Sequence, residues 1–152
     1  MKALYAAMCL MALPALADEA LPGWAVYETD KTYEALVADT KAAVKANGLI
    51  VVTQAGPTKA AAARGITIPG NRVIGVFNND YAVRVLETST EAMIEAPIRF
   101  YLTENEDGTA TLSYKTPSFV FAPYANQGGA ALSDIGAELD VKFQSIAESA
   151  LK

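Results

Sequence analysis

The sequence contains no histidine and only one cysteine, Cys9, which lies near the N-terminus. Without histidine, neither a cysteine–histidine pair nor a serine–histidine–aspartate triad can be assembled. Zinc and haem sites that depend on histidine or cysteine ligands are excluded on the same ground. We therefore expect no metal and no cofactor and assign no catalytic residue, so any reaction would have to use carboxylate, lysine, tyrosine, serine or arginine groups.

The N-terminus has the layout of a secretory signal peptide. Its start is positively charged, residues 3–13 form an unbroken apolar run, and Ala15-Leu16-Ala17 is a cleavage signal of the A-x-A type. The apolar run is too short to span a bilayer. We predict a signal peptide at residues 1–17, cleavage between Ala17 and Asp18, and a periplasmic or secreted mature protein.

The mature chain, residues 18–152, is acidic and long enough for one domain. Removing 17 of the 152 residues leaves 135, which is enough for a real core. The formal net charge is −5, and the loss of Lys2 with the signal peptide makes it −6. Because an acidic surface repels nucleic acid and anionic lipid, we expect neither as a partner after cleavage. A lipid anchor at Cys9 is disfavoured, because only six apolar residues separate it from Lys2.

Hydrophobic periodicity predicts alternating strands and helices along the mature chain. The run at 49–53 is apolar and β-branched, so we predict a central strand there, and Thr29 is the expected N-cap of the helix before it. The mixture of helices with a hairpin favours the α+β class, with an antiparallel or mixed curved sheet and two main helices packed on one face. The expected strands lie at 24–28, 49–53, 72–77, 98–103 and 110–115, and the expected helices lie at 29–47, 58–64, 81–87, 89–95 and from 133 onward.

The hairpin of the last two strands predicts two different faces of the sheet. Alternate residues form an apolar set and a mostly polar set, and Asp107-Gly108 supplies the turn. Arg99 and Tyr101 belong to the polar set, which could hold a ligand or a second subunit; the alternative is an ordinary solvated face. The apolar set is Ile98, Phe100, Leu102, Ala110, Leu112 and Tyr114, and the polar set is Arg99, Tyr101, Thr103, Thr111, Ser113 and Lys115.

Residues 117–129 lack a clear period, so we predict an irregular segment there, although it is unusually apolar. Phe121 and Tyr124 belong to its aromatic stretch, 119–124, which could form a lid, a ligand wall or an interface. The alternative, which we favour, is that the stretch folds back to close the core, because buried aromatic side chains dominate protein cores.

Four segments stand in order between residues 29 and 117. They are the helix leading into Gly48-Leu49-Ile50-Val51, the Gly65-Ile66 segment with Pro69 and Arg72-Val73-Ile74, the turn Phe77-Asn78-Asn79-Asp80, and Ala96-Pro97-Ile98-Arg99 followed by Gly108, Ser113-Tyr114 and Pro117. In this order and spacing the chain resembles the bacterial family catalogued as domain of unknown function 302. The resemblance implies a compact α+β domain, with helices on a curved antiparallel sheet, that is able to dimerise. The family brings no agreed reaction.

The chain departs from the family pattern at two places. The turn at 77–80 stands where the family typically has Phe-Gly-Asn-Pro, and Ala96 stands where it typically has leucine. A family site at that turn would be altered here, so Asn78 and Asn79 join the candidate residues.

We predict that the protein is an exported, non-catalytic domain that binds a small molecule or a protein partner, with a homodimer among the expected assemblies. The alternative is a hydrolase or another enzyme that uses Arg99, Tyr114, Glu95 and Lys115, although their spacing identifies no nucleophile with its base. The candidate ligand or interface residues are Arg99, Tyr101, Tyr114, Asn78, Asn79, Phe121 and Tyr124.

Overall fold

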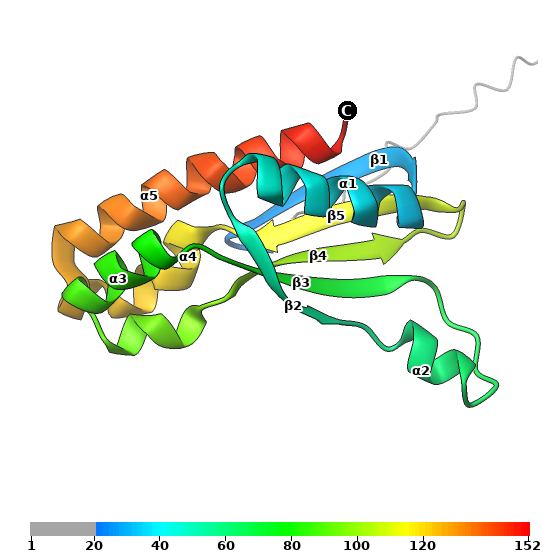
Figure 1. Ribbon diagram of the computed structural model, residues 1–152, viewed down its shortest axis with the longest axis horizontal. Helices are drawn as coiled ribbons and strands as arrows, with labels where there is room; N and C mark the ends of the chain where they lie inside the picture. Colours follow the sequence, from blue (N-terminus) through cyan, green and yellow to red (C-terminus); the bar gives the residue numbers. More distant parts are fainter. Residues whose placement is uncertain (1–20) are drawn as a thin grey trace, which may run out of the picture.

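The computed structural model describes residues 21–152, which form one five-stranded sheet with two long helices on one of its faces (Figure 1). The predicted signal peptide at residues 1–17 and its cleavage site lie outside the described residues. The strands are β1 (Trp24–Thr32), β2 (Ile50–Ala55), β3 (Asn71–Phe77), β4 (Ile98–Glu104) and β5 (Thr109–Lys115). The helices are α1 (Tyr33–Ala46), α2 (Thr58–Ala62), α3 (Asn79–Thr88), α4 (Pro117–Phe121) and α5 (Ala125–Ala150), with 3-10 turns η1 (Glu91–Glu95) and η2 (Ala122–Tyr124).

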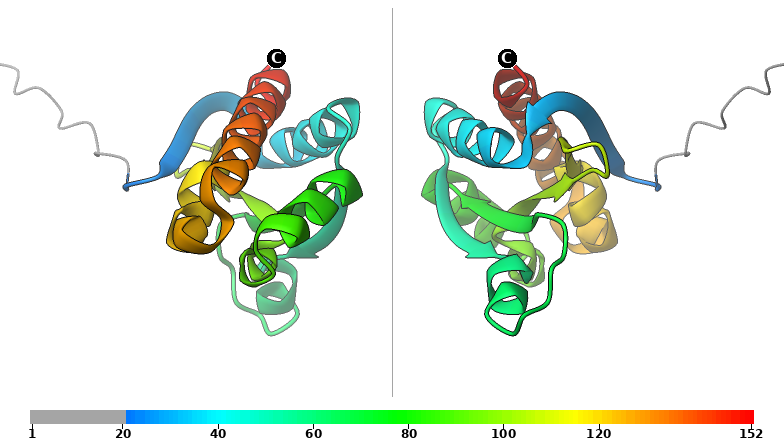
Figure 2. Two further views of the ribbon diagram at one scale, coloured as in Figure 1. Left: turned by 90° about the vertical axis from the view of Figure 1, so that its left-hand side faces the viewer. Right: turned by 90° about the vertical axis from the view of Figure 1, so that its right-hand side faces the viewer.

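The sheet order is β1-β5-β4-β3-β2, and every neighbouring pair of strands is antiparallel. The sheet is strongly curved, and α1 and α5 lie side by side on the same face (Figure 2). The predicted α+β class, with an antiparallel curved sheet and two main helices on one face, is therefore confirmed. Within residues 21–152, no helix has the length and apolarity that crossing a membrane requires.

Helix α1 begins three residues later than the sequence predicts. Thr32, and not Thr29, is its N-cap, and the Thr32 hydroxyl oxygen accepts a hydrogen bond from the Ala35 N–H at 3.4 Å. Thr29 instead belongs to β1, where its hydroxyl donates to the carbonyl oxygen of Ala110 in β5 at 2.8 Å. Strand pairing with a distant segment thus extends β1 through the residues that could have begun the helix. The helix ends before Gly48, whose φ of 76° a residue with a side chain rarely adopts.

Strand β2 lies at an edge of the sheet, so the prediction of a central strand at 49–53 is wrong. Within the described chain β2 pairs only with β3. Leu49 and Val51 pack against the core, but Ile50 and Val52 are 58% and 45% exposed. The apolar run therefore does not reflect burial on both faces, which is the usual cause of such a run in a central strand.

The segment at 117–129, predicted to be irregular, is helical. Pro117 occupies the first turn of α4, where the missing proline N–H leaves no hydrogen bond unmade. Helix α5 follows after η2 and contains a kink at Gly129, where φ is 56° and ψ is −150°. The predicted start of the last helix at Ser133 is therefore wrong, because the helix already runs through this position and the Ser133 hydroxyl donates to the Gly129 carbonyl oxygen.

The hydrophobic core lies between the covered face of the sheet and helices α1 and α5. Phe100 of β4 is at its centre and is completely buried. Its ring stacks on Phe143 of α5, with the ring centroids 4.6 Å apart, and meets Tyr114 of β5 edge to face at 5.3 Å. The alternation predicted for the hairpin is thus realised, and the polar set is left for the opposite face. The core also contains Leu36, Val44, Ile74, Val76, Leu112, Leu139 and Ile146.

Candidate functional site

The face of the sheet opposite α1 and α5, which we call the open face, has a hollow of about 410 Å³. Strands β1, β3, β4 and β5 form its floor, and η1 and α4 flank it with Glu95 and Val120. Apolar and aromatic surface is supplied by Trp24, Val73 and Tyr101. The hollow therefore combines a flat apolar floor with charged side chains, which is the usual composition of a small-molecule site.

Two cations stand next to each other in one row across the floor of the hollow. Phe100 of β4 pairs with Tyr114 of β5, so in this antiparallel pair Arg99 lies opposite Lys115. Lys115 in turn pairs with Trp24 of β1. The Lys115 ammonium lies 5.9 Å from the centroid of the Trp24 ring. Arg99 is exposed and has no hydrogen bond or ion pair to any residue in the described part of the chain. Its guanidinium can thus bind an anionic group of a ligand without losing an internal partner.

Tyr101 lies in the next row of the open face and is half-buried. Its hydroxyl accepts a hydrogen bond from Nδ2 of Asn71 at 2.6 Å, which fixes the direction of the side chain. Val73 pairs with Tyr101 across β3 and β4, so the ring and the valine lie on the same face. The prediction that Arg99 and Tyr101 project from the open face agrees with this register.

The row that contains Arg99 continues through Gly75 of β3 and Thr53 of β2. A methyl group at Gly75 would collide with the Thr53 hydroxyl and with the Pro97 ring. Glycine at this position therefore lets Pro97, the residue before β4, lie directly against the sheet. This contact places the end of η1 over the open face, where Glu95 borders the hollow.

Glu95 connects the hollow to the aromatic stretch that precedes α5. The Tyr124 hydroxyl donates a hydrogen bond to Oε1 of Glu95 at 2.7 Å. This bond raises the pKa of the Tyr124 phenol, since the neutral hydroxyl is the donor, so Tyr124 remains protonated at neutral pH. The other carboxylate oxygen of Glu95 can accept a hydrogen bond from a ligand. The hollow thus presents two cations and one acceptor.

Tyr114, a predicted site residue, borders the hollow but is only 3% exposed. Its ring packs on the core side against Phe100 and Phe143, and its hydroxyl lies 3.5 Å from that of Tyr27. Burial is the main cause that raises the pKa of the Tyr114 phenol, so the group is a poor proton donor to a ligand. Its placement is that of a core residue.

The remaining predicted residues lie away from the hollow. The side-chain oxygen of Asn78 caps α3 by accepting from the Asp80 and Tyr81 N–H groups, and its Nδ2 donates to the Gly48 carbonyl oxygen at 2.9 Å. Asn79 is exposed in the first turn of the same helix, and Phe121 is buried in the core. The structure therefore brings Arg99, Tyr101 and, through Glu95, Tyr124 to one place. It leaves Tyr114 buried at the border of the hollow and the other three candidates elsewhere.

Six residues of the hollow are not among the predicted ligand or interface residues, and they are Trp24, Val73, Glu95, Ile98, Lys115 and Val120. Of these, Glu95 and Lys115 belong only to the alternative prediction of an enzyme. Trp24 and Val73 come from segments far from the hairpin in sequence, and Val120 lies in α4, shortly after the hairpin. Trp24 carries a sequence signal of its own, because it is the only tryptophan and the first residue of an expected strand. Residues 21–152 contain no group of three or more histidine, cysteine, aspartate or glutamate side chains placed to hold a metal ion.

Comparison with known proteins identifies the family. The profile of the domain of unknown function DUF302 matches residues 25–150. The chain belongs to the DUF302 family. This confirms the resemblance that the order of sequence segments indicated. The match extends from β1 through α5 and includes the covered core and every residue of the hollow except Trp24.

A solved structure shares the fold of this DUF302 chain. It is the crystal structure of an uncharacterized conserved DUF302 protein from Bacillus stearothermophilus, with a TM-score of 0.75 and 15% sequence identity. The alignment covers 87% of this chain and 100% of that chain. No curated protein matches the sequence.

Proposed function

We propose that this DUF302 protein is an exported, non-catalytic binding protein that holds a small anionic molecule with a flat apolar body in the hollow of the open face. The observation that carries the proposal is the pair of adjacent cations, Arg99 and Lys115, beside an aromatic floor. The chain has 17 acidic and 12 basic residues. Two neighbouring cations in one hollow are therefore not what the net negative charge of the chain would lead one to expect. Arg99 has no partner among the described residues, which leaves it free for the ligand.

The rest of the hollow supports a ligand of limited size with an aromatic or planar apolar part. Its volume of about 410 Å³ falls within the range of small-molecule sites. Trp24 and Tyr101 supply faces on which a planar group can stack. Glu95 adds specificity, because its free oxygen favours a ligand that also carries a hydrogen-bond donor.

The test uses anilinonaphthalene sulfonate, which joins an anionic group to flat aromatic rings. Trp24, the only tryptophan, lies at the hollow, so quenching of its fluorescence reports binding there. Arg99→Ala and Lys115→Ala should each weaken binding about tenfold or more, because a hydrogen bond to a charged group is worth about 1.5–3 kcal/mol. Lys41→Ala, which removes an exposed cation on α1, is the matched control and should leave the affinity unchanged.

The neutral analogue phenylnaphthylamine separates charge recognition from apolar contact. It should bind more weakly than the sulfonate to the wild-type protein and equally well to the wild type and to Arg99→Ala. The proposal fails if Arg99→Ala and Lys41→Ala have the same affinity for the sulfonate. Export is tested separately: the intact mass of the natural protein should correspond to a chain that begins at Asp18, and a chain that retains Met1 would contradict it.

A further inference from the structure

The outer edge of β2 is a free strand edge of an unusual composition. Its six residues, Ile50–Ala55, include no charge and no proline, and five of them are exposed. Edge strands commonly carry lysine or proline, which prevent pairing with another chain, and here only a bulge between Val51 and Thr53 interrupts the edge. An uncharged edge of this kind can pair with an identical strand, because no like charges are opposed.

A projecting segment continues directly from this edge. Residues 56–69, which we call the arm, contain α2 and extend beyond the sheet (Figure 1). Nearly the whole arm is exposed and α2 has no buried residue, although Thr58 Oγ1 donates to the Pro69 carbonyl oxygen at 3.2 Å and closes the arm at its base. The arm is rich in alanine and isoleucine, and its only charges are those of Lys59 and Arg64. It is thus an apolar, cationic element with little contact to its own chain.

The opposite end of the molecule presents complementary chemistry. Residues 79–95, which form α3 and η1 and which we call the α3–η1 surface, contain four acidic residues and one arginine. Exposed apolar side chains lie among these acids, and Ile94 is 78% exposed, the highest value of any large apolar side chain among the described residues. The acidic residues are Asp80, Glu87, Glu91 and Glu95, and the other exposed apolar residues are Val83 and Leu86.

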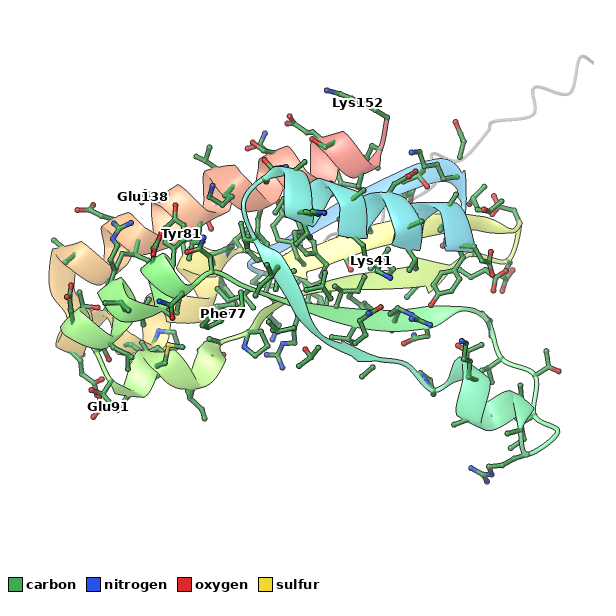
Figure 3. The ribbon with its side chains drawn as sticks, viewed as in Figure 1. Lys41, Phe77, Tyr81, Glu91, Glu138 and Lys152 are labelled. Atoms are coloured by element: carbon green, nitrogen blue, oxygen red, sulfur yellow. The ribbon has the colours of Figure 1, made fainter. Side chains whose placement is uncertain are left out.

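Strand β2 spans the distance between these two surfaces. Its first residue, Ile50, pairs with Phe77, the last residue of β3 before α3, and its last residue, Ala55, leads into the arm. Glu91 accordingly lies at the end of the molecule opposite α2 (Figure 3). If two such strands pair in antiparallel orientation, the end of each strand meets the beginning of the other. The arm of one copy then reaches the α3–η1 end of its partner.

We propose that two copies of this chain associate through β2, which pairs with its own copy about a two-fold axis, and that the arm of each copy packs on the α3–η1 surface of the other. The two sheets join into one continuous sheet, and the same patch of each subunit is used twice, as two-fold symmetry requires. Lys59 and Arg64 meet acidic side chains, while the alanines and Ile66 cover Ile94 and its neighbours. The hollow of the open face shares only Glu95 with the α3–η1 surface. The dimer tests leave Glu95 unchanged, so ligand binding and dimer formation fail independently in the tests.

Sedimentation velocity of the purified protein over a range of concentrations tests the strand pairing. The wild type should be dimeric at about 100 μM, a concentration at which an interface of standard size associates. Val52→Lys places a charge on the edge of each copy and should raise the dissociation constant about tenfold or more. Val141→Lys is the matched control, because Val141 is also an exposed valine but lies on α5, and it should leave the dimer unchanged.

Charge reversal tests the contact of the arm. The double variant with Lys59→Glu and Arg64→Glu should weaken the dimer, and so should the double variant with Glu87→Lys and Glu91→Lys. A chain that carries all four substitutions restores opposite charges across the interface and should recover the dimer. The proposal is overturned if the wild type is monomeric at about 100 μM or if Val52→Lys leaves the dimer intact. It is also overturned if the chain with all four substitutions dimerises no more strongly than either double variant.

Discussion

Phe100 and Arg99 are neighbours in β4, and they stand on opposite faces of the same sheet. Phe100 is completely buried between Tyr114 and Phe143, whereas Arg99 is exposed and contacts no charged partner in the described chain. The covered face is apolar and closely packed, and the open face carries cations, hydroxyl groups and a tyrosine. The two faces of the same strands therefore differ in role. The covered face stabilises the fold, whereas the side chains of the open face can be replaced without loss of stability.

The largest effect should come from the covered face. Phe100→Ala removes a ring from the centre of the core, and we expect it to lower the free energy of unfolding by about 3–5 kcal/mol. The measurement is chemical denaturation monitored by circular dichroism. Arg99→Ala, one residue away on the open face, should change the same free energy by no more than about 0.5 kcal/mol. Similar losses for the two variants would show that the faces do not differ in this way.

Gly75 lies on the open face, but a substitution there should lower the free energy of unfolding as a substitution in the core does. Gly75→Ala forces Thr53 or Pro97 to move, and we expect a loss of about 1–3 kcal/mol, the usual cost of overpacking. Ser113→Ala removes a hydroxyl from the same face without adding volume, and it serves as the control in the same denaturation experiment. If Gly75→Ala is as stable as the control, Pro97 does not pack tightly against the sheet.

The smallest effect should come from the ion pair between Arg84 of α3 and Glu138 of α5, whose side chains are both exposed. Figure 3 labels Glu138 on α5. The hydrogen bond from Arg84 lowers the pKa of the Glu138 carboxyl from its usual 4.5. A lowered carboxyl pKa stabilises the fold above the unfolded pKa, and this stabilisation is lost as the pH falls through the folded pKa. Arg84→Gln should therefore lower the melting temperature slightly at pH 7 and not at a pH well below 4.5.

Comparing the melting temperatures of the wild type and its variants at neutral and low pH checks the sign of this effect. Glu138→Gln should reproduce the small loss at neutral pH, because it removes the same ion pair from the other side. A difference between wild type and Arg84→Gln that grows as the pH falls would contradict the assignment.

The sequence predicted the hairpin faces correctly because local alternation is sufficient to define them. Residues two apart share a face whatever lies elsewhere in the chain, so Phe100 and Arg99 were assigned to opposite faces without knowledge of the helices. The family was also predictable, because the order and spacing of four short segments match the family pattern even though two of the individual motifs depart from it.

The position of a strand within the sheet was not predictable from the residues of that strand. The run at 49–53 has the composition of a central strand, and its place at the edge depends on which other strands pair with β3. The error at Thr29 has a similar origin, because the hydroxyl that could cap a helix bonds instead to Ala110, about eighty residues away in the chain.

The hollow could be predicted only in part for the same physical reason. Arg99, Tyr101 and Lys115 follow from the alternation of one hairpin. Trp24 joins them through the pairing of β1 with β5, and Glu95 is placed by the contact of Pro97 with Gly75. Contacts between segments distant in sequence leave no periodic signal along the chain.

The pairing of β1 with β5 also determines when the fold can be completed. The first strand of the described chain has no neighbour in the sheet except a strand about ninety residues later, and the last helix supplies Phe143, Ile146 and Ala150 to the core. A chain of this topology cannot finish its core while its C-terminal residues are still being synthesised. The complete fold therefore forms only after the whole polypeptide is available, and it forms more slowly than a fold built on local contacts, because its decisive contacts join segments distant in sequence.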